Sequence, residues 1–173
     1  DDFSALESAA RMGFVLDLPP STAMRPGVAS VVLDRLQDAG NVGSILRSAA
    51  ALGFSQVVAL KGSAALWSPK VLRAGMGAHF GLHLVEAIEP AALAELQLPL
   101  IATSSHQGEP VHATKLPWPC AWAFGHEGQG LHAAVAQQAR AWCRIGQPGG
   151  QESLNVAAAA AICLHASAIG QLH

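Results

Sequence analysis

A chain of 173 residues with 51% hydrophobic and only 13% charged side chains has the length of one domain and little polar surface to cover it, which favours a homo-oligomer. Its formal net charge of −2 argues against binding to nucleic acid by bulk electrostatic attraction. No apolar run has the length or the flanks of a membrane span or a signal peptide, so we expect no membrane association.

The cysteines and the charges add two expectations. The cysteines are three in number and widely spaced within apolar runs, so we expect reduced core residues of a cytoplasmic protein and no metal site: Cys120, Cys143 and Cys163. Between positions 35 and 85 the only acid is Asp38, against five cations: Arg35, Arg47, Lys61, Lys70 and Arg73. This excess fits a solvated face somewhat better than a polyanion-binding surface.

The order of elements predicts the fold class. Residues 1–28, with Pro19-Pro20 and Pro26-Gly27, are predicted to be a lead-in or the remnant of a linker, and residues 29–173 one domain. Short apolar or β-branched runs then recur, with helical spacing between most of them, at 31–33, 57–60, 82–85, 99–102, 121–124 and 141–145. This alternation predicts an α/β fold with a mainly parallel sheet flanked by helices.

Five helices are predicted between these strands. The clearest follows Asn41, with a stripe of apolar residues on one face and Gly53 as its stop. Others are expected at about 69–79, at about 91–96, as a short helix after Leu131, and at about 153–168. The last is apolar nearly all round, which predicts burial on most of its sides.

Three glycine-containing loops each follow a predicted strand, at 34–43, 124–131 and 144–157. Loops at the carboxyl ends of parallel strands converge on one edge of a sheet, where ligands bind. The middle loop reverses the order of the dinucleotide fingerprint, and neither a P-loop nor a G-x-S-x-G elbow is present. His79 and His83 have helical spacing but lack a third metal ligand, and His126 in the middle loop suits a backbone or solvent role at least as well as catalysis.

Taken together, the three loops resemble the signature motifs of the SpoU-type (TrmH-type) branch of the SPOUT RNA methyltransferases. The matching stretches are residues 33–49 (LDRLQDAGNVGSILRSA), 124–131 (FGHEGQGL) and 152–159 (ESLNVAAA). The resemblance implies an α/β fold with a carboxyl-terminal trefoil knot, S-adenosyl-L-methionine as cofactor, an obligate homodimer, and methyl transfer to a ribose 2′-hydroxyl of tRNA or rRNA.

The resemblance also implies site residues, carried over position by position. The catalytic set is Asn41, Arg47, Glu127, Ser153 and Asn155. The cofactor would rest on Thr103, Gly125, Ile145, Gln147 and Leu154. Ser153 and Asn155 would cap the last helix while facing the pocket. The resemblance makes Arg47 the base. Because guanidinium is essentially always protonated, a clamp on the target phosphate is the open alternative, with Glu127 holding Arg47 or a backbone amide.

Two departures and two alternatives stay open. Ala39 stands where many relatives have proline, and the proline of the cofactor loop is displaced to Pro148. Relatives often carry an amino-terminal RNA-binding domain, which we expect to be missing from these 173 residues. The alternatives are a catalytically inactive RNA-binding or ribosome-associated protein with the same fold, and an unrelated nucleotide-binding α/β enzyme.

Overall fold

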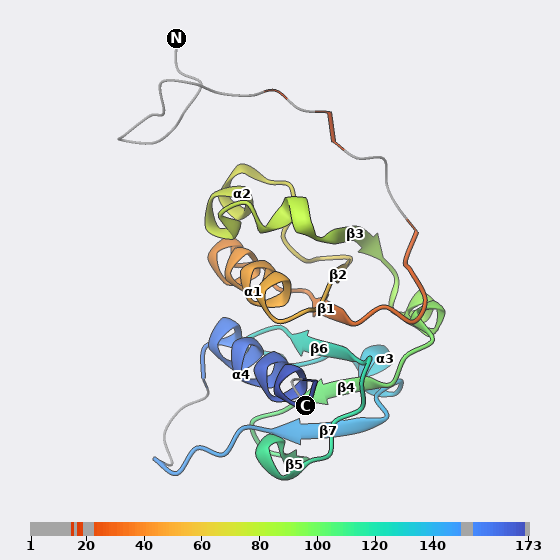
Figure 1. The fold of residues 1–173 in the computed structure, drawn as a ribbon, viewed down its shortest axis with the longest axis vertical. Coiled ribbons are helices and arrows are strands. Elements are labelled where there is room, and N and C mark those ends of the chain that lie inside the picture. Colours follow the sequence, from red (N-terminus) through yellow and green to blue (C-terminus); the bar gives the residue numbers. More distant parts are fainter. Residues whose placement is uncertain (1–14, 16, 19–22, 150–153, 172–173) are drawn as a thin grey trace.

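The protein is built on a parallel sheet, as predicted. The computed structural model describes residues 15, 17–18, 23–149 and 154–171. In these residues the sheet has seven strands in the order β3-β2-β1-β6-β4-β7-β5, and every paired neighbour runs parallel (Figure 1). The strands are β1 (Ser30–Asp34), β2 (Gln56–Leu60), β3 (His83–Ile88), β4 (Leu100–Thr103), β5 (Glu109–Pro110), β6 (Ala121–Gly125) and β7 (Ala141–Arg144).

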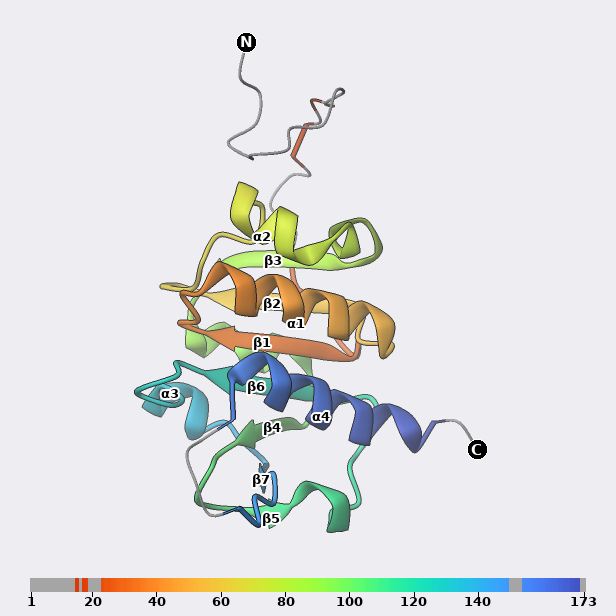
Figure 2. The ribbon, with the colours of Figure 1, turned by 90° about the vertical axis from the view of Figure 1, so that its left-hand side faces the viewer.

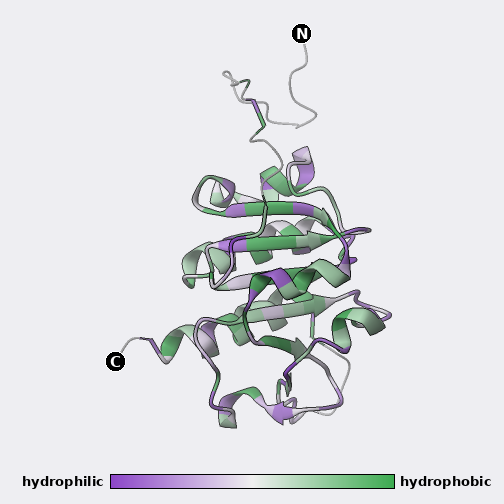
Figure 3. Ribbon diagram, turned by 90° about the vertical axis from the view of Figure 1, so that its right-hand side faces the viewer, coloured by the Kyte–Doolittle hydropathy of each residue, from purple (hydrophilic) through white to green (hydrophobic). Residues whose placement is uncertain are grey.

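Helices cover both faces of the sheet. The α-helices are α1 (Ala39–Ala51), α2 (Pro69–Gly75), α3 (Ala133–Ala136) and α4 (Val156–Ile169), and the 3-10 helices are η1 (Ala78–Gly81), η2 (Pro90–Leu96) and η3 (Val111–Ala113). Figure 2 shows α1, α2 and α4 on one face. Along β1, Val31 and Leu33 point into the core under α1 and α4, whereas Val32 packs with η2 and α3. This alternation follows from the two-residue period of a strand and makes the middle of the sheet hydrophobic (Figure 3).

Helix α1 begins and packs as its sequence predicts. The Asp38 side chain caps it by accepting a hydrogen bond from the Asn41 amide at 2.7 Å. Its apolar stripe is buried, and Gly43 lies where α2 crosses. A Cβ at position 43 would stand 2.4 Å from the Ala74 Cβ, so only glycine allows this close approach.

Helix α4 is buried on one side only, so the prediction of burial on most sides was wrong for the single chain. Its core face consists of Ala160, Cys163, Leu164 and Ser167. Ser167 is polar but satisfied, because its Oγ accepts a hydrogen bond from the Trp122 indole at 2.9 Å. The opposite face leaves Ile162 41% and Ile169 49% exposed, because no other element of the described chain packs over it.

Two predicted helices take other forms. The stretch 69–79 does not form one helix, because Met76 adopts a left-handed φ of 48° and Gly77 follows with 87°, and the chain resumes as η1. The stretch 91–96 is the 3-10 helix η2, which ends at the left-handed Gln97. The two-residue strand β5 was not predicted, since Glu109–Pro110 carries no strand periodicity.

The cysteines are core residues, as predicted. Cys120, Cys143 and Cys163 are all buried and free. Burial raises the pKa of Cys120 to about 11 and that of Cys163 to about 12, because a thiolate would lose its hydration in the core. The pKa of Cys143 is raised for the same reason.

The resemblance implies a carboxyl-terminal trefoil knot, and the segment between β7 and α4 belongs to that part of the chain. Residues 150–153 of that segment lie outside the described residues, so the knot stays a prediction. Of the helices in the described part of the chain, none combines the length and the apolar character needed to span a bilayer.

Candidate functional site

The strand order sets up a site beside β1. In the sheet, β2 and then β3 lie on one side of β1, and β6, β4 and β7 lie on its other side. Strand order therefore reverses between β1 and β6, and such a switch point is where open α/β sheets bind ligands. Asn41 lies in the first turn of α1, the helix that follows β1, and Glu127 lies in the loop that follows β6.

A chain of side-chain hydrogen bonds joins the three predicted motifs at this point. The Asn41 Nδ2 donates to Glu127 Oε1 at 3.0 Å, and the Asn155 Nδ2 donates to Asn41 Oδ1 at 2.9 Å. Asn41 and Asn155 are 114 positions apart in the sequence. No hydrogen bond among the described residues uses Glu127 Oε2, so within this part of the chain the exposed carboxylate has an acceptor oxygen to offer a ligand.

Asn155 serves the helix and the site together. Its Oδ1 accepts from the amides of Ala157 at 2.9 Å and Ala158 at 3.3 Å, which caps α4. Its Nδ2 faces Asn41. The prediction that Asn155 caps this helix is confirmed, whereas the same prediction for Ser153 falls outside the described residues.

Arg47 lies apart from this chain of hydrogen bonds. It is exposed on α1, where Ser44, Arg47, Ser48 and Ala51 border a surface hollow of about 420 Å³. It lies six positions beyond Asn41, which in an α-helix means about 9 Å along the axis and a different side. Among the described residues Glu127 is bound by the Asn41 side chain, so the prediction that it holds Arg47 or a backbone amide stays a prediction.

The residues predicted to bind the cofactor lie at the ends of adjacent strands. Thr103 ends β4, Gly125 ends β6, and Ile145 directly follows β7. These three strands are parallel neighbours, so their carboxyl ends share one edge of the sheet. Gln147 is half-buried in the segment after β7, and Leu154, next to Asn155, is 40% exposed.

Two residues at the end of β1 were quoted in the first motif without a role. Asp34 is buried, and its Oδ2 accepts from the backbone amide of His132. Arg35 donates from Nη1 to Gln129 Oε1 at 2.9 Å and from Nη2 to the Gly130 carbonyl at 3.0 Å. The sequence feature that could have pointed to this pair is an acidic residue at the end of an apolar strand, because a buried carboxylate needs hydrogen-bond partners.

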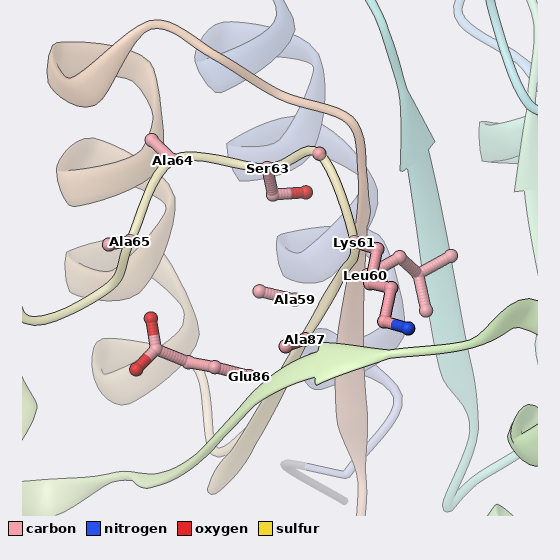
Figure 4. A pocket seen from close by; sticks show the side chains of 9 residues that line it. Ala59, Leu60, Lys61, Ser63, Ala64, Ala65, Glu86 and Ala87 are labelled. Atoms are coloured by element: carbon pink, nitrogen blue, oxygen red, sulfur yellow. The ribbon is translucent and has the colours of Figure 1, made fainter.

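The other histidines and hollows have structural explanations. His126 Nδ1 accepts from the Gly128 amide at 3.0 Å, which is a backbone role, and the buried His79 Nε2 contacts the Leu66 carbonyl at 2.8 Å. A second hollow of about 210 Å³ lies between the loop after β2 and the end of β3 (Figure 4). Its carboxylate, Glu86, already accepts from the Leu66 amide. The described residues contain no group of three potential metal ligands.

A parallel α/β sheet with a polar site at its switch point is typical of ligand-binding α/β proteins. Comparison of the sequence with known protein families identifies the family. The family described as "SpoU rRNA Methylase family" matches residues 29–165. The chain belongs to this family, and the resemblance seen in the three motifs is confirmed.

Similar proteins agree with this assignment. The 23S rRNA (guanosine(2553)-2′-O)-methyltransferase RlmP of Bacillus subtilis is 33% identical over 138 residues, which are 78% of this chain and 56% of that protein. The human mitochondrial rRNA methyltransferase 3 is 52% identical over 59 residues, which are 34% of this chain and 14% of that protein. The chain thus spans little more than half of its bacterial relative and a small part of the human one.

A solved structure shares the fold. The SpoU methyltransferase AviRb of Streptomyces viridochromogenes, crystallised with the cofactor AdoMet, superposes with a TM-score of 0.81 at 27% identity. The match covers 90% of this chain and 67% of that one. The predicted α/β class is therefore confirmed by the sheet and by this likeness.

Proposed function

We propose that residues 29–173 form the catalytic domain of an RNA methyltransferase that uses S-adenosyl-L-methionine to methylate a ribose 2′-hydroxyl of tRNA or rRNA. The observation that carries the proposal is the Asn155–Asn41–Glu127 chain, in which residues of all three family motifs meet. The name of the Bacillus subtilis relative, a 2′-O-methyltransferase of 23S rRNA, supports the reaction, and the AdoMet complex of AviRb supports the cofactor.

The ends of β4, β6 and β7 suit an adenosyl ligand. Backbone at Thr103, Gly125 and Ile145 can bond the polar edge of adenine, and the exposed Leu154 offers an apolar surface for its ring. Gln147 would contribute from the loop after β7. When bound, S-adenosyl-L-methionine supplies an electrophilic methyl group, which moves from its sulfonium sulfur to the ribose oxygen and leaves S-adenosylhomocysteine.

The hydrogen-bonded side chains of Asn155, Asn41 and Glu127 are suited to bind the ribose. A hydroxyl becomes a good nucleophile only when an acceptor takes or binds its proton. Oε2 of Glu127, which no described residue binds, is an acceptor beside two oriented amides. Asn41 and Asn155 hold each other and so present a fixed set of donors and acceptors. Ser153 is proposed to join this set, and Arg47 to bind a phosphate of the RNA with its guanidinium fork.

We also propose that the chain acts as a homodimer whose second copy covers α4. The exposed apolar side chains of Ile162 and Ile169 lie about two turns apart on the same side of α4. Helix α4 packs beside α1, which carries Arg47. A second copy there would bury these isoleucines and bring the two Arg47 hollows near the interface. The buried free cysteines suit a reducing compartment, and we propose the cytoplasm.

Methyl transfer to rRNA tests the proposed reaction. The purified chain would be incubated with bacterial rRNA and S-adenosyl-L-methionine carrying a labelled methyl group, and the RNA digested to nucleosides for mass spectrometry. Label on a 2′-O-methyl nucleoside, absent with Asn41→Ala, is the expected result. Label on a base would refute ribose methylation. Binding of RNA and of S-adenosylhomocysteine without any transfer would favour the inactive RNA-binding alternative.

A further inference from the structure

Arg35 has an unusual backbone and an ordered side chain. It directly follows β1 and has a φ of 60°, in the left-handed region that residues with a Cβ rarely adopt. Its stem lies against Gly62, where an added Cβ would stand 3.3 Å from the Arg35 Cγ. A strained backbone persists only where its surroundings hold it, and such positions cluster at functional sites.

The Arg35 guanidinium ties the end of β1 to the loop after β6. It donates to Asp34 Oδ1 at 3.1 Å, to Gln129 Oε1 at 2.9 Å and to the Gly130 carbonyl at 3.0 Å. The Asp34 side chain is only 2% exposed, and its other oxygen accepts from the His132 amide. Three of the five N–H groups of Arg35 are thereby engaged within the described chain.

The loop from Gly125 to Leu131 is thereby held at two points. On one side Glu127 is bound by Asn41, and on the other Gly130 is bound by Arg35. Between these points the loop folds back on itself, because the Gly130 amide donates to the His126 carbonyl at 2.8 Å. A Cβ at Gly125 would stand 2.4 Å from the Gly130 carbonyl carbon, so the two glycines are closely packed against each other.

We propose that Arg35 is a positioning residue, which holds the 125–131 loop so that Glu127 meets Asn41 and Gly125 faces the cofactor. The ligand part of this inference rests on the proposed function, whereas the loop part stands on the contacts alone. A bidentate guanidinium fixes both distance and angle, which a lysine ammonium cannot reproduce.

Two variants and a matched control separate positioning from simple stabilisation. Arg35→Gly removes the guanidinium and also relieves the backbone, because glycine adopts φ near 60° freely. Gln97→Gly is the matched control. It relieves the same left-handed backbone strain, at a φ of 51°, in an exposed residue at the end of η2. Arg35→Lys keeps the charge without the fork. Each chain would be studied by urea denaturation, amide hydrogen exchange and titration with S-adenosylhomocysteine.

The proposal predicts a loop defect without a global one. Arg35→Gly should unfold at the urea concentration of Gln97→Gly, while the Gly130 and His132 amides exchange about tenfold faster than in the wild type. Affinity for S-adenosylhomocysteine should fall about tenfold in Arg35→Gly, with at most partial recovery in Arg35→Lys and no change in Gln97→Gly.

Two results would overturn the positioning role. One is unchanged exchange at Gly130 and His132 in Arg35→Gly; the other is a fall in global stability that accounts for all of the faster exchange. If the wild-type chain itself fails to bind S-adenosylhomocysteine, the proposed function is refuted, and the exchange rates still decide whether Arg35 holds the loop.

Discussion

At the scale of single residues, Asn155 shows how one side chain can serve both stability and the site. Its oxygen caps α4 and its nitrogen binds Asn41, so each half of the amide has a separate task. Deleting the side chain removes both the helix cap and the hydrogen bond to Asn41, whereas replacing the amide by another polar group can remove only one of them. The two contributions are therefore separable by mutation.

Asn155→Asp and Asn155→Ala make this separation. Asp keeps an oxygen for the amides of Ala157 and Ala158 but has no N–H for Asn41, so its unfolding free energy should stay near wild type. Ala should cost about 1 kcal/mol through the lost cap. Both should lower methyl transfer about a hundredfold, because the amide network loses its order. Urea denaturation and the rRNA assay measure the two effects; wild-type activity in the Asp variant would remove Asn155 from the reaction.

The buried thiols predict a loss of stability in alkali. Because the folded pKa of Cys120 is about 11, above its ordinary 9.0, the folded chain keeps a proton that the unfolded chain releases. This stability is fully present below pH 9 and is lost as the pH rises toward 11. The expected loss from Cys120 between these limits is about 2 kcal/mol. Urea denaturation with reductant at pH 8 to 10.5 measures it. Cys120→Ala should make the fall in stability less steep, while Cys143 and Cys163, whose pKa values are also raised, keep their share. An equally steep curve in that variant would contradict the assignment.

At the scale of elements, the sequence predicted the helices and strands that are determined by hydrophobic periodicity and by capping residues. The six predicted strands and α1 follow from periodicity and from the Asp38 cap. The break after α2 depends on Met76 turning left-handed, and α4 is half exposed because nothing described packs over Ile162. The hydrophobic periodicity of the sequence predicts neither the break after α2 nor the exposed face of α4. Of the predicted site, Asn41, Glu127 and Asn155 do meet, whereas Arg35 was missed because its role depends on a loop 95 positions away.

The crossing of α1 and α2 gives a test at this scale. Replacing glycine by alanine inside a helix normally stabilises it by about 0.5–1 kcal/mol. Gly43→Ala should instead destabilise the protein by about 1–3 kcal/mol, because the new Cβ would meet Ala74 at 2.4 Å. The double variant with Ala74→Gly should recover part of the loss. A Gly43→Ala protein as stable as wild type in urea would show that the helices can separate without cost.

At the scale of the whole molecule, the low charge content and the face of α4 that no described element covers support the proposed homodimer. Ile162→Asp would place a charge in the proposed interface. If the wild-type chain is the proposed dimer in analytical ultracentrifugation, this variant should be a monomer. Phe80→Asp is the matched control, because Phe80 is 74% exposed but lies on η1, away from α4. Dissociation by the Phe80 change but not by the Ile162 change would place the interface elsewhere.

The central claim is that the carboxyl ends of β4, β6 and β7 bind an adenosyl cofactor beside the Asn155–Asn41–Glu127 chain. Calorimetric titration of the purified chain with S-adenosylhomocysteine, with ATP and NAD as controls, tests it most directly. We predict saturable binding near one ligand per chain for S-adenosylhomocysteine alone. A folded chain that fails to bind it, or that binds ATP equally well, would contradict the claim, and the second result would favour an unrelated nucleotide-binding enzyme.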